Sequence, residues 1–229
     1  MKQAQWFEID KEGLARIIKR RGLQFVPFEL IANAWDSKAT EVCVTLLSVF
    51  GTRQARLVVT DDDPDGFADI GHAYTLFADS CRRGNPLQRG RFNIGEKLVL
   101  SVATNAVIMT TTAGLVFNAT GRHRTMRRTR KGSEIEVVFP ATHKQIEEML
   151  QAMHQLIPPI PTRVNGVLLP VPLPVATFSA SLETILPDSE GNLSHYTRKT
   201  TAHIQENWEP ASSTPDTLGT CLGLGVYPV

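Results

Sequence analysis

Apolar residues recur at helical spacing in four stretches of the chain, so the sequence predicts four helices. In the first, Leu14, Ile17 and Ile18 lie on one side, and Asp10 is suited to cap the N-terminus. The second is predicted to begin at Pro27, because a helix tolerates proline in its first turn. The predicted helices cover about 10–21, 27–35, 95–103 and 142–156.

Runs rich in β-branched and apolar residues lie between the helices and predict strands. Two of these runs are joined by GTRQ, which is typical of a hairpin turn. A longer stretch has glycines at its turns and predicts a β meander. The strands are EVCVTLLSVF (41–50), ARLVVT (55–60) and the meander over 106–139, with turns at Gly114, Gly121 and Gly132.

Proline marks the end of the first predicted domain. The stretch PPIPTRVNGVLLPVPLP (158–174) holds six of the chain's 14 prolines, which indicates a boundary near 158. Beyond it, ATFSASLETIL and HYTRKTTAHIQ flank PDSEGN and predict a hairpin. We therefore expect one domain over 1–157 and, over 158–229, the β-rich start of a second domain that is incomplete in this chain.

Composition sets few limits on function. Of the 229 residues, 42% are hydrophobic, and the net charge of +1 indicates neither a nucleic acid nor a membrane partner. The longest apolar stretch, LVLSVATNAVIM (98–109), is too short and too polar to span a bilayer, and the N-terminus lacks the layout of a signal peptide. We therefore expect a cytoplasmic protein. Cys43, Cys81 and Cys221 lie too far apart to indicate a disulfide framework or a zinc site.

The second predicted helix gathers three polar side chains on one side. At about 100° per residue, Asn33 lies about 40° and Asp36 about −20° from Glu29, opposite the apolar face. A solvated helix surface is the ordinary explanation of such a face. The alternative is a site in which the asparagine carbonyl binds Mg²⁺ and a carboxylate takes a proton from water.

Two other stretches carry residues suited to a nucleotide. VVTDDDPDGF (58–67) places acids at the end of a predicted strand, where a carboxylate can accept a hydrogen bond from the exocyclic amine of adenine. RGRFNIGEK (89–97) places Gly90 and Gly95 before a helix, where backbone N–H groups can approach phosphate. Each stretch alone is weak evidence, because ordinary turns and loops share these compositions.

In order and spacing these stretches resemble the motifs of the GHKL ATPases, a group containing gyrase-type topoisomerases, a heat-shock chaperone, MutL and sensor histidine kinases. Their E-x-x-x-N-x-x-D-A motif is similar to ELIANAWDSKAT (29–40), and their D-x-G-x-G motif to 62–66, with Pro64 replacing a glycine. Their G-x-x-G-x-G motif resembles 90–95, with Asn93 where glycine is common, and their late G-T or G-S resembles Gly132-Ser133. The resemblance covers about 8–140 and extends to a set of uncharacterised prokaryotic ATP-binding proteins.

The resemblance implies an α+β fold, a two-layer α/β sandwich of the Bergerat type. Helices would cover one face of a mixed, mostly antiparallel sheet, and a transducer-like second domain would follow. It implies Glu29 as the general base, Asn33 as the Mg²⁺ ligand and Asp62 as the acid that reads adenine, with Asp61 in that role if the turn is shifted. The other residues implied to bind or support ATP are Asp36, Gly66, Gly90, Phe92, Asn93, Ile94, Gly95, Lys97 and Ser133.

The function implied is magnesium-dependent ATP binding and hydrolysis, with closure of a lid over 70–90 and rearrangement of domains or of a dimer. The implied partners are ATP, a second copy of the chain and a protein or DNA client, with no membrane. A catalytically silent nucleotide-binding switch stays an alternative, because Pro64 and Asn93 replace glycines. A histidine kinase is disfavoured, because the first histidine, His72, follows the asparagine motif.

The meander also contains an arginine-rich stretch, GRHRTMRRTRKG (121–132). Alternate strand positions share a face, so Arg122 with Arg124, or Arg128 with Arg130, would form a basic stripe suited to a phosphate backbone. A nucleic-acid-binding module is therefore a further alternative. A charged edge that protects the sheet from aggregation explains the same residues. No aromatic residue interleaves the arginines, so stacking of single-stranded bases is not indicated.

Overall fold

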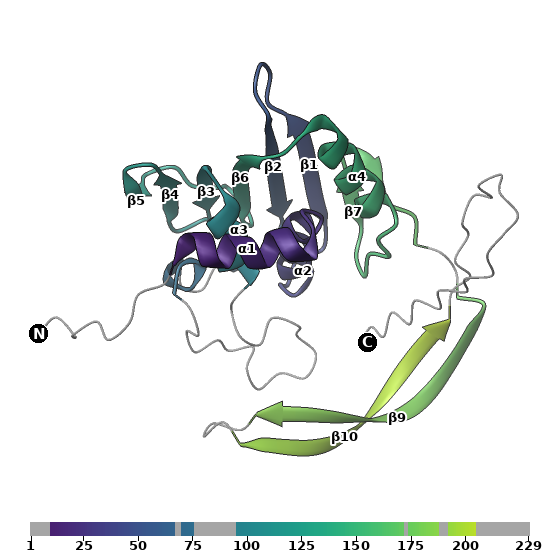
Figure 1. The fold of residues 1–229 in the computed structure, drawn as a ribbon. Coiled ribbons are helices and arrows are strands. Elements are labelled where there is room, and N and C mark those ends of the chain that lie inside the picture. The colour runs from purple at the N-terminus through teal and green to yellow at the C-terminus, as the bar shows by residue number, and fades with distance from the viewer. Residues whose placement is uncertain (1–9, 67–69, 76–94, 172–173, 188–191, 205–229) are drawn as a thin grey trace, which may run out of the picture. The chain divides into compact units, whose positions relative to one another are not determined.

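The computed structural model describes residues 10–66, 70–75, 95–171, 174–187 and 192–204 (Figure 1). Four α-helices lie within these ranges, each close to its predicted position, and a short 3-10 helix, η1, covers Ile70–Ala73. Asp10 and Thr142 cap the first and the last of them, the latter through the predicted capping box with Gln145. The helices are α1 (Lys11–Arg21), α2 (Phe25–Trp35), α3 (Gly95–Val102) and α4 (His143–His154).

Eight strands form the main sheet, in the order β5-β4-β3-β6-β2-β1-β7-β8. Every neighbouring pair is antiparallel except β1 with β7, which is parallel and aligns Val42 with Thr162. The strands are β1 (Val42–Ser48), β2 (Gln54–Asp61), β3 (Asn105–Met109), β4 (Gly114–Asn118), β5 (Gly121–Thr125), β6 (Glu134–Pro140), β7 (Thr162–Val164) and β8 (Val167–Leu168).

The predicted meander is correct only for its first three strands. After β5 the chain returns past β4 and β3, and β6 inserts between β3 and β2. The alternating residues Ile135, Val137 and Phe139 of β6 are all buried, so one face of this strand belongs to the core. A place in the middle of the sheet suits such a strand.

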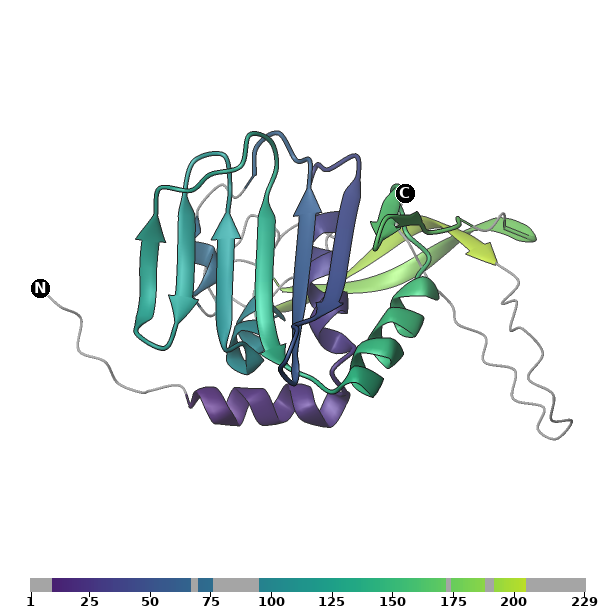
Figure 2. The same ribbon diagram turned by 90° about the horizontal axis from the view of Figure 1, so that it is seen from above.

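The core lies between one face of the sheet and the helices. Ala55, Leu57 and Val59 of β2 alternate with more exposed residues and point to the buried face, where Leu30 and Ile31 of α2 are also buried. Figure 1 shows α1, α2 and α3 on one side of the sheet, and Figure 2 shows the strands side by side. The predicted α+β fold, a mostly antiparallel sheet with helices against one face, is confirmed. No helix within the described ranges is long and apolar enough to cross a lipid bilayer.

The first compact unit extends beyond the boundary predicted at 158. Strands β7 and β8 belong to the main sheet, and Val164 and Leu169 are buried in its core, so the unit continues to Leu169. The prolines of this stretch flank two short strands, and they do not end the fold. A second unit begins at Pro170 and contains the predicted hairpin, an antiparallel pair of β9 (Ala176–Pro187) and β10 (Leu193–Ile204).

Candidate functional site

The acid of the opening motif packs against the glycine that begins α3. Glu29 is half-buried on α2, and a Cβ added at Gly95 would overlap its Oε2 atom. A side chain at this position would displace the Glu29 carboxylate. The contact joins two segments that are far apart in the sequence, and it places a carboxylate beside the N-terminus of α3.

The environment of Glu29 makes its carboxyl more basic than an exposed one. Burial raises its pKa from the ordinary value of 4.5, and the positive charge of Arg21 opposes that rise. A carboxylate with a raised pKa holds a proton more readily near neutral pH, which suits it to general base catalysis.

Asn33 is held by a buried charged pair at the start of α3. Its Nδ2 atom donates a hydrogen bond to Glu96 Oε1 at 3.4 Å, and Glu96 Oε2 lies 3.6 Å from Lys97 Nζ. Glu96 and Lys97 are only 7% and 6% exposed. With Nδ2 directed to Glu96, the amide presents Oδ1 as its acceptor atom, the kind of ligand that Mg²⁺ prefers.

Lys97 is 6% exposed, so it is not an ordinary surface lysine, and its predicted contact with phosphate stays a prediction. Its ammonium group is buried next to a carboxylate on the same helix, and this pair supports Asn33. Glu96 was missed in the sequence, because its role depends on a contact between α2 and α3 that no local pattern reveals.

A second group of predicted residues lies where β2 ends. Asp61 continues the inward alternation of Leu57 and Val59, so its carboxyl points to the face that the helices cover. Its Oδ1 atom accepts hydrogen bonds from the N–H groups of Asp63 at 3.0 Å and Ser133 at 3.1 Å. Within the described ranges no hydrogen bond is made to Oδ2. Burial raises the pKa of Asp61, although the two backbone donors oppose the rise.

Asp62 faces away from this position and is engaged in holding a loop. Its carboxylate accepts hydrogen bonds from Thr40 N and Oγ1, both at 2.6 Å, from Glu41 N at 3.0 Å and from Lys131 Nζ at 2.8 Å. The Lys131 and Thr40 side-chain bonds, together with the backbone donors, hold the pKa of Asp62 well below its usual range. The Asp62 carboxylate is thus occupied within the fold, whereas Asp61 faces the side that the helices cover, and which of the two acids reads adenine stays a prediction.

Two glycines let the acidic turn meet the later strands. Gly66 has a φ of +60°, and a Cβ there would lie 3.5 Å from Thr110 Cβ, while Gly132 has a φ of +65° and its added Cβ would overlap the Asp61 carbonyl oxygen. The acidic turn therefore contacts Thr110, which follows β3, and Gly132. Thr110 is completely buried here and was also missed in the sequence.

Lys38 connects the two groups of residues. It follows α2, its N–H donates to Asp63 Oδ2 at 3.1 Å, and its Nζ pairs with Asp65 Oδ2 at 2.5 Å. The C-terminal end of α2, where Asp36 lies, is therefore tied to the acidic turn after β2. Among the predicted residues, Gly90, Phe92, Asn93 and Ile94, and most of the predicted lid, lie outside the described residues.

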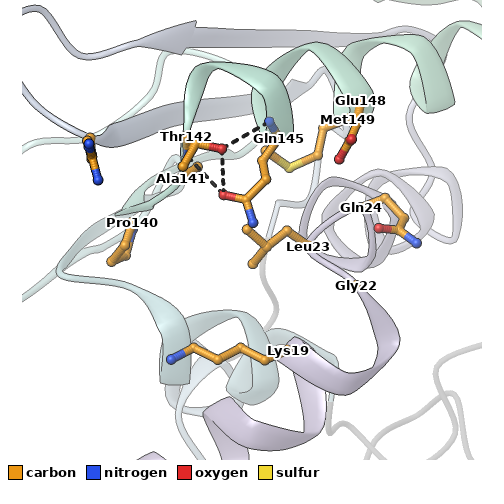
Figure 3. Close-up of a pocket in the computed structure, with 11 residues that line it drawn as sticks. Lys19, Gly22, Leu23, Gln24, Pro140, Ala141, Thr142, Gln145, Glu148 and Met149 are labelled. Carbon is orange, nitrogen blue, oxygen red and sulfur yellow. Dashed lines mark hydrogen bonds between the residues drawn. The ribbon is translucent and has the colours of Figure 1, made fainter.

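A cavity of about 460 Å³ lies elsewhere in the same unit (Figure 3). Lys19 at the end of α1, Leu23 before α2, and Thr142 and Gln145 at the start of α4 line it. None of the predicted site residues that the structure describes lines this cavity. A second cavity of about 440 Å³ is lined by Lys97 together with Lys11, Tyr74 and Arg122.

The fold is similar to solved ATPase regions of type II topoisomerases. The ATPase region of Saccharomyces cerevisiae topoisomerase II aligns with 80% of this chain at 13% sequence identity and a TM-score of 0.47. The structure of that region bound to ICRF-187 (dexrazoxane) aligns with 64% of this chain at 14% sequence identity and a TM-score of 0.45. The ATPase and transducer domains of topoisomerase II from Balamuthia mandrillaris align with 65% at 11% identity and a TM-score of 0.45. This chain covers 58%, 48% and 48% of those structures, about half of their length. No protein-family model and no curated protein matches the chain.

Proposed function

We propose that this chain binds ATP with Mg²⁺ and hydrolyses it in the manner of a GHKL ATPase. The observation that carries the proposal is the contact of the half-buried Glu29 carboxylate with Gly95 at the N-terminus of α3. A base and a phosphate-binding helix end would have to lie side by side in such a site.

The reaction asks three things of these residues. Backbone N–H groups at the start of α3 would bind phosphate oxygens, because a helix N-terminus carries positive potential. Glu29 would orient a water and take its proton as the water oxygen attacks the γ-phosphorus. The bond from that phosphorus to the β–γ bridging oxygen breaks, and ADP leaves with the bond's electron pair.

The donor set near α2 fits a Mg²⁺ ion that is held mainly by the nucleotide. The described residues contain no cluster of three or more His, Cys, Asp or Glu that could form a cation site by itself. Mg²⁺ commonly takes one or two protein oxygens together with phosphate oxygens and water. Asn33 Oδ1 would be such a ligand, and the ion would neutralise charge on the phosphates when bound.

Asp61 would recognise the adenine ring. Its Oδ1 atom is satisfied by two backbone donors, which leaves Oδ2 to accept a hydrogen bond from the N6 amine. Ser133, whose N–H donates to Asp61 Oδ1, lies beside Asp61 and would support the adenine end of the nucleotide. Gly66 and Asp36 would line the part of the site between the adenine ring and the phosphates.

Glu29→Gln tests the proposal, because glutamine keeps the size of the side chain and cannot accept the proton. We expect calorimetry to show ATP affinity within about threefold of the wild type, and phosphate release to fall by roughly 100-fold or more. The raised pKa of Glu29 predicts that wild-type kcat falls on acidification at a pH above 4.5, where an ordinary glutamate would titrate.

The control is Glu12→Gln, which removes an exposed acid from the first turn of α1 and should leave turnover unchanged. Equal phosphate release by wild type and Glu29→Gln would show that Glu29 is not the base. ATP binding without turnover in the wild type would favour a silent switch, and no ATP binding would refute the proposal. The dimer, the client and the nucleotide-driven rearrangement stay predictions.

A further inference from the structure

The edge strand β5 and the loop after it carry a dense run of positive charge. Residues 122–131 contain six of the chain's 24 Lys and Arg residues, and no Asp or Glu lies anywhere between 114 and 133. All six side chains are exposed, on a chain whose total charge is nearly balanced. We call this set the basic edge: Arg122, Arg124, Arg127, Arg128, Arg130 and Lys131.

Part of the basic edge is already engaged within the fold. The Arg122 guanidinium lies over the Tyr74 ring, 3.5 Å from its centroid, and Lys131 pairs with Asp62 at 2.8 Å. In the part of the chain that the structure describes, four other members make no ion pair and no hydrogen bond through their side chains. These are Arg124, Arg127, Arg128 and Arg130.

The loop that carries these arginines is fixed to the sheet. Thr129 N donates to Thr110 O at 3.0 Å, Thr129 Oγ1 donates to Gly132 O at 2.6 Å, and Arg127 N donates to Thr125 Oγ1 at 3.2 Å. The backbone is therefore ordered before any partner arrives, which lowers the entropy cost of binding.

Protection of the sheet edge does not account for the whole set. One or two charges on an edge strand suffice to discourage pairing with another sheet. Strand β5 ends at Thr125, yet Arg127, Arg128 and Arg130 follow in the loop, where there is no strand edge to protect. The charge therefore continues beyond the strand, over a surface broad enough for a polyanion.

We propose that the basic edge binds the phosphate backbone of duplex DNA. Guanidinium groups match phosphate oxygens in a bidentate way, and Arg124, Arg128 and Arg130 are exposed. No aromatic residue interleaves the arginines to stack single-stranded bases. Met126, 87% exposed, is the one large apolar side chain of the stretch 121–132, which is too little to anchor a membrane. This binding does not depend on the nucleotide site.

The test measures binding of the full chain to a labelled DNA duplex of about 20 base pairs by fluorescence anisotropy, in about 50 to 200 mM salt. We expect the triple change Arg124→Gln, Arg128→Gln and Arg130→Gln to lower affinity at least about tenfold. It should also reduce the slope of log K against log salt by about 2.7, or roughly 0.9 for each lost phosphate contact. A triple change to lysine keeps the charge and should retain most of the slope.

The matched control removes the same charge from α1 and α4, by changing Arg16, Arg20 and Lys144 to Gln, and should alter affinity less than about threefold. The proposal would be overturned if both glutamine triples lost the same affinity for the duplex, or if the wild type did not bind the duplex in about 50 mM salt. Tighter binding to phosphatidylserine vesicles than to the duplex would also overturn it. Thermal unfolding verifies that each variant folds. ATP affinity, measured on the same samples, separates a failure here from a failure of the nucleotide site.

Discussion

Asp61 and Asp62 are adjacent in the chain and have opposite environments. Strand alternation turns Asp61 toward the helices, where burial raises its pKa, and turns Asp62 toward Lys131 and Thr40, whose hydrogen bonds lower its pKa. Asp61 therefore accepts hydrogen bonds from backbone N–H groups on the side that the helices cover, and Asp62 holds the loop before β1.

Asp61→Asn and Asp62→Asn should separate these roles. Asparagine offers a donor where adenine needs an acceptor, so we expect Asp61→Asn to weaken ATP binding by about tenfold or more in calorimetry. Asp62→Asn should leave ATP affinity nearly unchanged and lower the Tm at pH 7. The opposite result, with ATP binding lost only in Asp62→Asn, would restore the motif-based assignment.

The stability cost of Asp62→Asn should also depend on pH. The folded-state pKa of Asp62 is depressed below the ordinary 3.8, so its ionised form stabilises the fold above that value and the benefit is lost as pH falls. The Tm difference between the wild type and Asp62→Asn should therefore shrink as the pH is lowered below about 3.8, as thermal melts at several pH values would show.

The sequence contains enough information to place Asp61 on the buried face of the sheet. The alternation of Ala55, Leu57 and Val59 assigns Asp61 to the buried face, although counting from the motif glycines gives Asp62. The buried states of Lys97 and Thr110 could not be found in this way. They depend on neighbours from distant segments, which leave no local pattern.

At the scale of elements, the site depends on how closely α2 approaches the start of α3. Both helices were predictable from local periodicity, and their contact was not, because it joins segments far apart in the sequence. Gly95 leaves room for the Glu29 carboxylate at this contact, since a side chain there would displace it.

We therefore expect Gly95→Ala to reduce phosphate release strongly, because Glu29 has to turn away, and to change the free energy of unfolding little, because only the flexible end of that side chain moves. Gly13→Ala is the control, because it lies in α1 beside the exposed Asp10 and gains helix propensity. Urea unfolding and phosphate release measure the two effects. Wild-type turnover in Gly95→Ala would mean that the close contact is not needed for catalysis.

At the scale of the whole molecule, strand order differs from chain order at two places. Strand β6 returns to the centre of the sheet, and β7 adds beside β1 after α4. Local patterns predicted most of the strands, but pairing is decided by long-range contacts, so the meander and the boundary at 158 were wrong in part. Trp35 Nε1 donates to Thr162 Oγ1 at 2.9 Å, which ties β7 to α2 as well.

A fragment ending at Leu169 should therefore fold, whereas a fragment ending at Ile157 should not reach the same stability. The shorter one lacks β7 and β8 and leaves Trp35 and Val42 without their cover. We expect a clearly lower Tm, or insoluble protein, for 1–157, and a cooperative melt for 1–169. Equal Tm values would place the end of the unit back near 158.

The parallel pairing of β1 with β7 also sets an order of events during translation. Strand β1 leaves the ribosome early, yet one of its edges stays open until residues 162–164 have been made. An open strand edge can recruit other polypeptides. Nascent chains paused within α4 should therefore be the stage at which this protein most needs a chaperone.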